Sequence, residues 1–290
     1  MNEIEVSLLQ TTNEIGVNIT HGDTPPYYVE KSINSNKTLI NANTMIDLRG
    51  IEDIDAYVLA YAYTNSNITG NIDMSPIKKL TNHYSCEYMF QSAHIDSVDL
   101  SGLEIVSGIS VFYGFCMNST LKSVNLSKLK TITGNGRSSS AFSNAFYGTQ
   151  LTEVSFDSLE EILSMTGSAF TSAFFNCRQL KQVNFPKLKV IEYLLNDSYG
   201  QMFGNCYALE SVLFGGVKAS TFTSRTNQFR FLFNASTGQN AENGCTVHFP
   251  SNFDPENPNK TFDITTLDGY PTFNGNSSYI HLAYDLPATE

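Results

Sequence analysis

The sequence predicts a β-rich repeat solenoid in which eight coils stack on one another. One aliphatic position recurs at strides of 26, 26, 26, 30, 29, 29 and 35 residues. An aromatic residue precedes this position by eight or nine residues in six successive repeats. A period of this length is typical of stacked units, none of which can bury its apolar stripe alone. The recurring aliphatic residues are Ile46, Ile72, Val98, Val124, Val154, Val183, Val212 and Val247, and the aromatic ones are Tyr63, Phe90, Phe115, Phe146, Phe174 and Phe203.

Each repeat is expected to begin with a short strand. The recurring aliphatic residue and the residue two positions later point to one side of a strand, so both side chains face inward. Stacked coils then pair these strands in one parallel sheet, and the usual crossover rule makes the solenoid right-handed. The segments on the opposite side are predicted to form one or two short helical turns: Cys86–Phe90, Ser140–Phe146 and Thr171–Cys177.

The chain divides into a central solenoid, residues 42–250, and two terminal segments. Residues 1–41 alternate apolar and polar positions, which predicts two strands around Thr11–Glu14. This segment is either a cap on the first repeat or a device for attachment or oligomerisation. Residues 251–290 are predicted to form a C-terminal cap with a final strand at Tyr279–Tyr284, since solenoids need polar caps.

The repeats resemble a known family. The segment Leu180-Lys-Gln-Val-Asn-Phe-Pro-Lys-Leu-Lys-Val-Ile191 and the motifs Phe174-Phe-Asn-Cys177 and Phe203-Gly-Asn-Cys206 are similar to the BspA-type leucine-rich repeat. The resemblance covers roughly residues 44–250. It implies a solenoid of the leucine-rich-repeat type, as found in bacterial and protist surface proteins and in phage structural proteins. The resemblance implies a binding function and identifies no ligand.

Composition and charge exclude some classes of partner. Charged residues make up 16% of the chain, and 28 acidic against 17 basic residues give a net charge of −11. Such a field repels phosphate backbones, so we expect no nucleic-acid partner. No apolar stretch approaches the length of a membrane span, and the first residues lack the basic and apolar regions of a secretory leader. The location is therefore left open: the cell surface if a leader was removed, or a virion if the chain is encoded by a phage.

No residue pattern predicts catalysis, a metal site or a cofactor. The five cysteines include no Cys-x-x-Cys pair, and the five histidines share no repeat position. Cys177 and Cys206 lie six residues before their anchors, so we expect them to be stacked, buried and reduced. No nucleophile, base and orienting group occur at a plausible spacing. We therefore predict that the protein is not an enzyme.

The outward strand positions are the candidate binding residues. The position after the anchor reads Asp47, Asp73, Asp99 and Asn125 in the first four repeats. Carboxylates about 4.8 Å apart in line repel by roughly 1 kcal/mol per pair in water. The stripe is either a solvated face that tolerates this cost or a site for a cation or ligand. Beside it lie loop residues of the longer fourth repeat: Asn135, Arg137 and Ser139.

Three functions are compatible with these observations. The first is a non-catalytic binding or adhesion module that recognises a protein or glycan surface. The second is a structural protein of a phage virion, such as a tail or fibre component, which a symmetric homo-oligomer in solution would favour. The third is a polysaccharide-cleaving enzyme on a parallel β-helix, which would need clustered carboxylates beside a basic residue.

Overall fold

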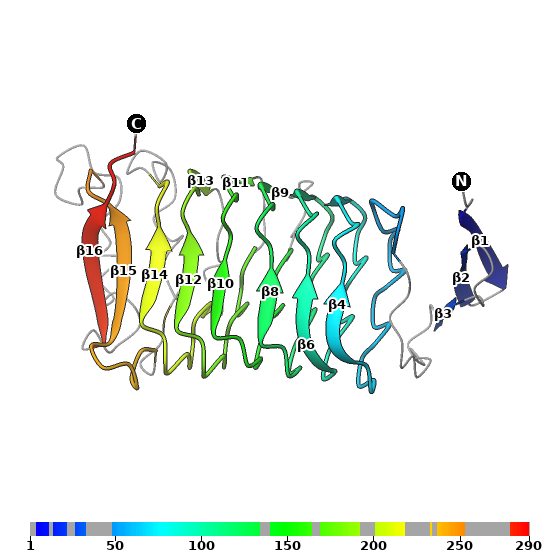
Figure 1. The fold of residues 1–290 in the computed structure, drawn as a ribbon, viewed down its shortest axis with the longest axis horizontal. Helices are drawn as coiled ribbons and strands as arrows, with labels where there is room; N and C mark the ends of the chain where they lie inside the picture. Colours follow the sequence, from blue (N-terminus) through cyan, green and yellow to red (C-terminus); the bar gives the residue numbers. More distant parts are fainter. Residues whose placement is uncertain are drawn as a thin grey trace.

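The protein is a β-rich solenoid built from stacked parallel strands (Figure 1). The computed structural model describes residues 4–11, 14–21, 27–32, 48–133, 140–163, 169–191, 201–217, 233, 237–252 and 279–289. Within these ranges every regular element is a strand and none is a helix. The prediction of a β-rich solenoid with parallel pairing is therefore confirmed.

One face of the solenoid carries two parallel sheets. The first has the order β4-β6-β8, formed by Thr69–Asp73, His94–Asp99 and Ser123–Asn125. The second has the order β10-β12-β14-β15-β16, formed by Glu153–Ser155, Gln182–Phe185, Ser211–Phe214, Cys245–Pro250 and Ile280–Leu286. The anchors lie in register: Ile72 pairs with Val98, Val98 with Val124, and Val183 with Val212.

The prediction of one parallel sheet is wrong, because this face has two parallel sheets and another side of the coil has a third. The face just described is interrupted between β8 and β10, where the stride lengthens to 30 residues and residues 134–139 lie outside the described part of the chain. At this interruption Val124 is only partly buried, although the anchors Val154 and Val183 are buried as expected. The anchor Ile46 lies outside the described residues.

A third parallel sheet lies on the side of the coil that the chain enters after each of these strands. Its order is β13-β11-β9-β7-β5, formed by Val190–Ile191, Glu161–Leu163, Thr131–Thr133, Ile105–Val106 and Lys79–Leu80. These strands contain the last aliphatic position of the repeat, such as Ile132 and Ile162, which pair with each other. The sequence pattern places this residue inward but does not predict that it belongs to a strand.

The predicted helical turns are replaced by chains of consecutive turns. In the first coil Ala62 N–H donates to the carbonyl of Leu59 three residues back, whereas Tyr63 N–H donates across to Met89 of the next coil. This alternation repeats along each turn segment. One residue in four has a positive φ, including Tyr88 at 50° and Asn144 at 55°, inside two of the predicted helical segments. A left-handed residue every four positions prevents an α-helix, and the alternating N–H groups bond to the neighbouring coil instead.

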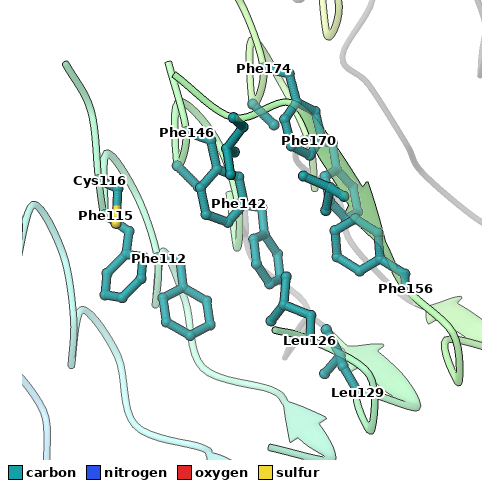
Figure 2. Packing of buried hydrophobic residues seen from close by; sticks show 14 of the residues in the cluster. Phe112, Phe115, Cys116, Leu126, Leu129, Phe142, Phe146, Phe156, Phe170 and Phe174 are labelled. Carbon is teal, nitrogen blue, oxygen red and sulfur yellow. The ribbon is translucent and has the colours of Figure 1, made fainter. Parts of the chain in front are cut away.

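Aromatic side chains fill the interior in columns that follow the solenoid axis (Figure 2). Phe146 stacks on Phe174 with ring centroids 5.4 Å apart, and Phe174 on Phe203 at 5.7 Å. All three side chains are fully buried, as the sequence predicted. A second column joins Phe142 to Phe170, with centroids 5.2 Å apart. Stacked rings of this kind join neighbouring coils, and the buried apolar side chains form one continuous cluster along the solenoid.

The terminal segments also form strands. β1 (Ile4–Thr11) and β2 (Glu14–His21) pair antiparallel, which confirms the two strands predicted around Thr11–Glu14, and β3 (Tyr27–Ser32) adds a third to this sheet. At the other end the predicted final strand is confirmed as β16, which pairs in parallel with β15. It therefore extends the sheet beyond residue 250. Among the described residues no helix is long and apolar enough to cross a membrane.

Candidate functional site

The outward stripe of strand residues exists as a line in register. Asp73 pairs with Asp99, and Asp99 with Asn125, in the ladder β4-β6-β8. Each side chain also has a structural role, because its Oδ1 accepts the backbone N–H two residues later, at 2.9 Å for Asp73 and Asp99 and 3.2 Å for Asn125. These bonds form Asx turns, which redirect the chain as it leaves the strand. The residue type at this position is therefore explained by the turn, without a ligand.

The other predicted site residues lie outside the described part of the chain. They are Asp47, Asn135, Arg137 and Ser139, so the predicted association of the loop with the stripe stays a prediction. In the described ranges no group of three or more His, Cys, Asp or Glu side chains could hold a metal ion.

The predicted cysteine column is present and buried. All five cysteines are free, and each is buried. Cys177 Sγ donates to the carbonyl of Phe146 at 2.9 Å, and Cys206 Sγ repeats this bond one coil later, to Phe174 at 3.0 Å. Burial raises the pKa of Cys177 to about 11. A thiol kept protonated in this way is a poor nucleophile, which fits a packing role.

Two charge columns follow the axis on the surface. In the first column, acidic and basic residues alternate from coil to coil, and each backbone N–H donates to the carbonyl of the preceding member. This column consists of Glu52, Lys78, Glu104, Lys130, Glu160 and Lys189. Lys130 Nζ lies 2.8 Å from Glu104 Oε2, and this hydrogen bond and charge lower the pKa of Glu104. The second column includes Asp96 with Lys122, 2.7 Å apart, and Lys181 with Glu210, 3.3 Å apart. Opposite charges on neighbouring coils attract, but because these side chains are about half exposed, each pair stabilises the stack only weakly.

A surface group of tyrosines was not predicted. We call it the tyrosine face, and it consists of Tyr57, Tyr61, Tyr84, Tyr88 and Tyr113, on the turn segments 56–65, 82–92 and 108–118. The rings of Tyr57 and Tyr84 stack with centroids 5.0 Å apart, and those of Tyr61 and Tyr88 lie at the same distance with their planes tilted by 34°. Tyr113 meets Tyr88 edge-on at 5.2 Å. Tyr57 is 46% exposed and the other four side chains are partly buried, so the rings form a firm, solvent-accessible surface.

The backbone under these tyrosines is unusual. Four of them have a positive φ: Tyr57 at 64°, Tyr61 at 60°, Tyr84 at 55° and Tyr88 at 50°. A bulky residue in this region costs about 1–2 kcal/mol. The corresponding positive-φ positions elsewhere in the described turns hold residues that tolerate the conformation better or are smaller: Asn65, Ser92, Ser110, Gly114, Asn118, Asn144, Gly148, Ser172, Asn176 and Asn205. Tyrosine is therefore present at these four positions against the conformational preference of the backbone.

The tyrosine face is also electrostatically distinctive. Its three turn segments contain no Lys or Arg, and Glu87 is their only carboxylate. Tyr61 N–H donates to the backbone carbonyl of Glu87 at 2.7 Å. Burial, the nearby Tyr84 and the charge of Glu87 together raise the pKa of Tyr57. Burial, followed by the charge of Glu87, raises the pKa of Tyr61 to about 12. Burial, a hydrogen bond with Tyr113 and nearby charges also raise the pKa of Tyr88.

A glycine of the next coil makes room for this surface. The Tyr88 ring lies against Gly114, where a Cβ would meet ring carbons at 2.3 and 2.4 Å. Gly114 also has a positive φ of 61°, so both space and backbone favour glycine. In the sequence this site leaves one signal: two tyrosines four residues apart, at 57 and 61, are repeated 27 residues later at 84 and 88.

Comparisons of this chain with family models, with curated proteins and with solved structures give no significant match.

Proposed function

We propose that this protein is a non-catalytic binding module that recognises the surface of a protein or a glycan. The observation that supports it best is the tyrosine face. Four tyrosines pair in register across two successive coils, at backbone positions that disfavour tyrosine, and Tyr113 meets Tyr88 edge-on from the third coil. Unfavourable backbone conformations of this kind gather at functional sites. Tyrosine is enriched in recognition surfaces because it offers a large contact area at a low entropic cost.

We further propose that the solenoid consists of eight right-handed repeats of the BspA-like leucine-rich type. The repeated motif around Val154, Val183 and Val212 supports this, as does their alignment in one ladder. An experimental structure of the whole chain would test the count and the handedness. A left-handed path, or a first repeat that does not stack on the second, would contradict the proposal.

The binding function is tested with the full chain on arrays of extracellular proteins and of glycans. We expect at least one class of ligand to bind, and the double variant Tyr57→Ala/Tyr84→Ala to weaken that binding by about tenfold or more, as for truncated aromatic anchors. The matched control is Ile105→Ala, because Ile105 is an exposed apolar residue, at 42%, on another side of the coil. Binding to neither array, or equal binding by all three proteins, would overturn the proposal.

Two further measurements separate the rival functions. Turnover of a polysaccharide, followed as newly formed reducing ends, would contradict the non-catalytic proposal directly. A symmetric homo-oligomer, seen by light scattering, would favour the structural virion component over a solitary binding module.

A further inference from the structure

Resting on the proposed function, we infer that the tyrosine face receives a cationic side chain, Arg or Lys, of a partner protein, held against the tyrosine rings beside Glu87. Tyr57, Tyr61, Tyr84 and Tyr88 occupy left-handed positions where the later coils have Gly, Asn or Ser. A fold requirement alone would favour those smaller residues, so the rings serve a purpose outside the backbone.

The charge of the tyrosine face favours a cation. A ring has negative electrostatic potential over its face, so clustered rings attract cations, and a nearby carboxylate strengthens the attraction. Glu87 supplies that carboxylate from the turn that separates Tyr84 from Tyr88. The three turn segments add no Lys or Arg, and the whole chain carries a net charge of −11. The surface is thus complementary to a positive group.

The tyrosine face is rigid. The rings pack against each other across successive coils at 5.0 Å, and the N–H groups of Tyr57, Tyr61 and Tyr88 bond to the next coil at 3.3, 2.7 and 2.8 Å. The surface is therefore formed before the partner arrives, which lowers the entropic cost of binding. Arginine suits such a surface well, since its planar guanidinium stacks on aromatic rings while it donates to a carboxylate.

The probe is a short oligoarginine peptide, titrated into the full chain and followed by calorimetry and by tyrosine fluorescence. The chain contains 15 Tyr and no Trp, so the fluorescence signal comes from tyrosine. Glu87→Gln should raise the Kd about tenfold, or roughly 1.4 kcal/mol. Tyr61→Asn should raise it about two- to thirtyfold, the range of one cation–π contact. Asparagine tolerates the positive φ, so we expect this variant to keep the fold.

Matched controls separate a specific site from general attraction to an acidic protein. Glu153→Gln removes the same charge from an exposed position on β10, and Ser172→Asn places asparagine at a left-handed position of a later coil. Both should change the Kd by less than about twofold. If Glu87→Gln and Glu153→Gln weaken binding equally, the peptide senses only the net charge and the inference is wrong.

A neutral oligosaccharide is titrated in parallel to distinguish the two proposals. If it binds, depends on Tyr61 and ignores Glu87, while the peptide does not bind, the cationic partner is refuted and the binding module stands. If Tyr61→Asn leaves peptide binding unchanged, the tyrosine face is not the site, even where the arrays show that the protein binds a ligand elsewhere.

Discussion

Replacing one interior ring should show how strongly the aromatic columns stabilise the solenoid. Phe142 is fully buried and lies between Phe112 and Phe170, with ring centroids 5.0 and 5.2 Å away. Phe156 and Phe146 complete its surroundings at 6.2 and 6.3 Å. A buried Phe→Ala change costs about 3–5 kcal/mol, because transfer energy is lost and a cavity remains. Four ring neighbours place Phe142→Ala near the upper end, about 5 kcal/mol.

The assay is equilibrium unfolding in urea together with thermal unfolding. At roughly 2–4 °C per kcal/mol for a chain of this order of size, the loss corresponds to a Tm lower by about 10–20 °C. Phe142→Leu keeps most of the volume and should lose only about 1–2 kcal/mol. Ile105→Ala, which removes an exposed apolar side chain, should stay within about 1 kcal/mol of the parent. A loss below about 2 kcal/mol for Phe142→Ala, or one equal to that of Ile105→Ala, would refute the continuous aromatic interior.

Three other predictions follow from local geometry. Gly102→Ala should lower the free energy of unfolding by more than about 3 kcal/mol, since its Cβ would lie 1.9 Å from the Ser75 carbonyl oxygen. Gly70→Ala meets no atom within 4 Å and should cost only about 1–2 kcal/mol, for its positive φ. Equal losses for the two variants in chemical unfolding would contradict this. The pKa of Cys177 is raised from 9.0 to about 11, so the unfolded chain loses this proton at a lower pH than the folded protein does. The free energy of unfolding should therefore fall as the pH rises from 9 to 11. Cys177→Ala should make that part of the stability–pH curve flatter. The double variant Asp73→Ala/Asp99→Ala removes two hydrogen-bond acceptors of the turns and should lower the free energy of unfolding in urea by about 1–3 kcal/mol. An unchanged or higher urea midpoint would mean that repulsion between the two carboxylates outweighs the turn hydrogen bonds.

The oxidation state of the cysteines can be checked with a thiol reagent. All five cysteines are free and buried, so the native protein should react slowly with a thiol reagent. After unfolding without reductant, the same reagent should count all five thiols. A lower count would reveal a disulfide between one pair.

The repeat period was enough to predict the solenoid and its parallel pairing. A fixed stride of apolar residues admits few ways to bury every stripe, and stacking the coils is the simplest. The buried state of Phe146, Phe174 and Phe203, the stacked thiols and the pairing of Val183 with Val212 followed from that period alone. These properties depend on inward side chains, whose spacing is visible in the sequence.

The outward features depended on the tertiary structure. The predicted helical turns became chains of consecutive turns because alternate N–H groups bond to the neighbouring coil, a partner that no local window of sequence contains. The sheet divides after β8 because the coil length changes there, although the anchors continue without a gap. Asp73 and Asp99 lie in line as predicted, yet their carboxylates accept turn N–H groups.

The tyrosine face shows the same division between sequence and structure. The sequence contains the paired tyrosines at 57 and 61 and at 84 and 88, but a four-residue spacing has no meaning until the turn geometry is known. The structure gives these residues a positive φ, packs their rings together across coils and brings Glu87 beside them. Interior side chains repeat because every coil must fill the same space, whereas surface side chains are free to vary. The period therefore determined the core, and only the folded coils decided which surface residues meet.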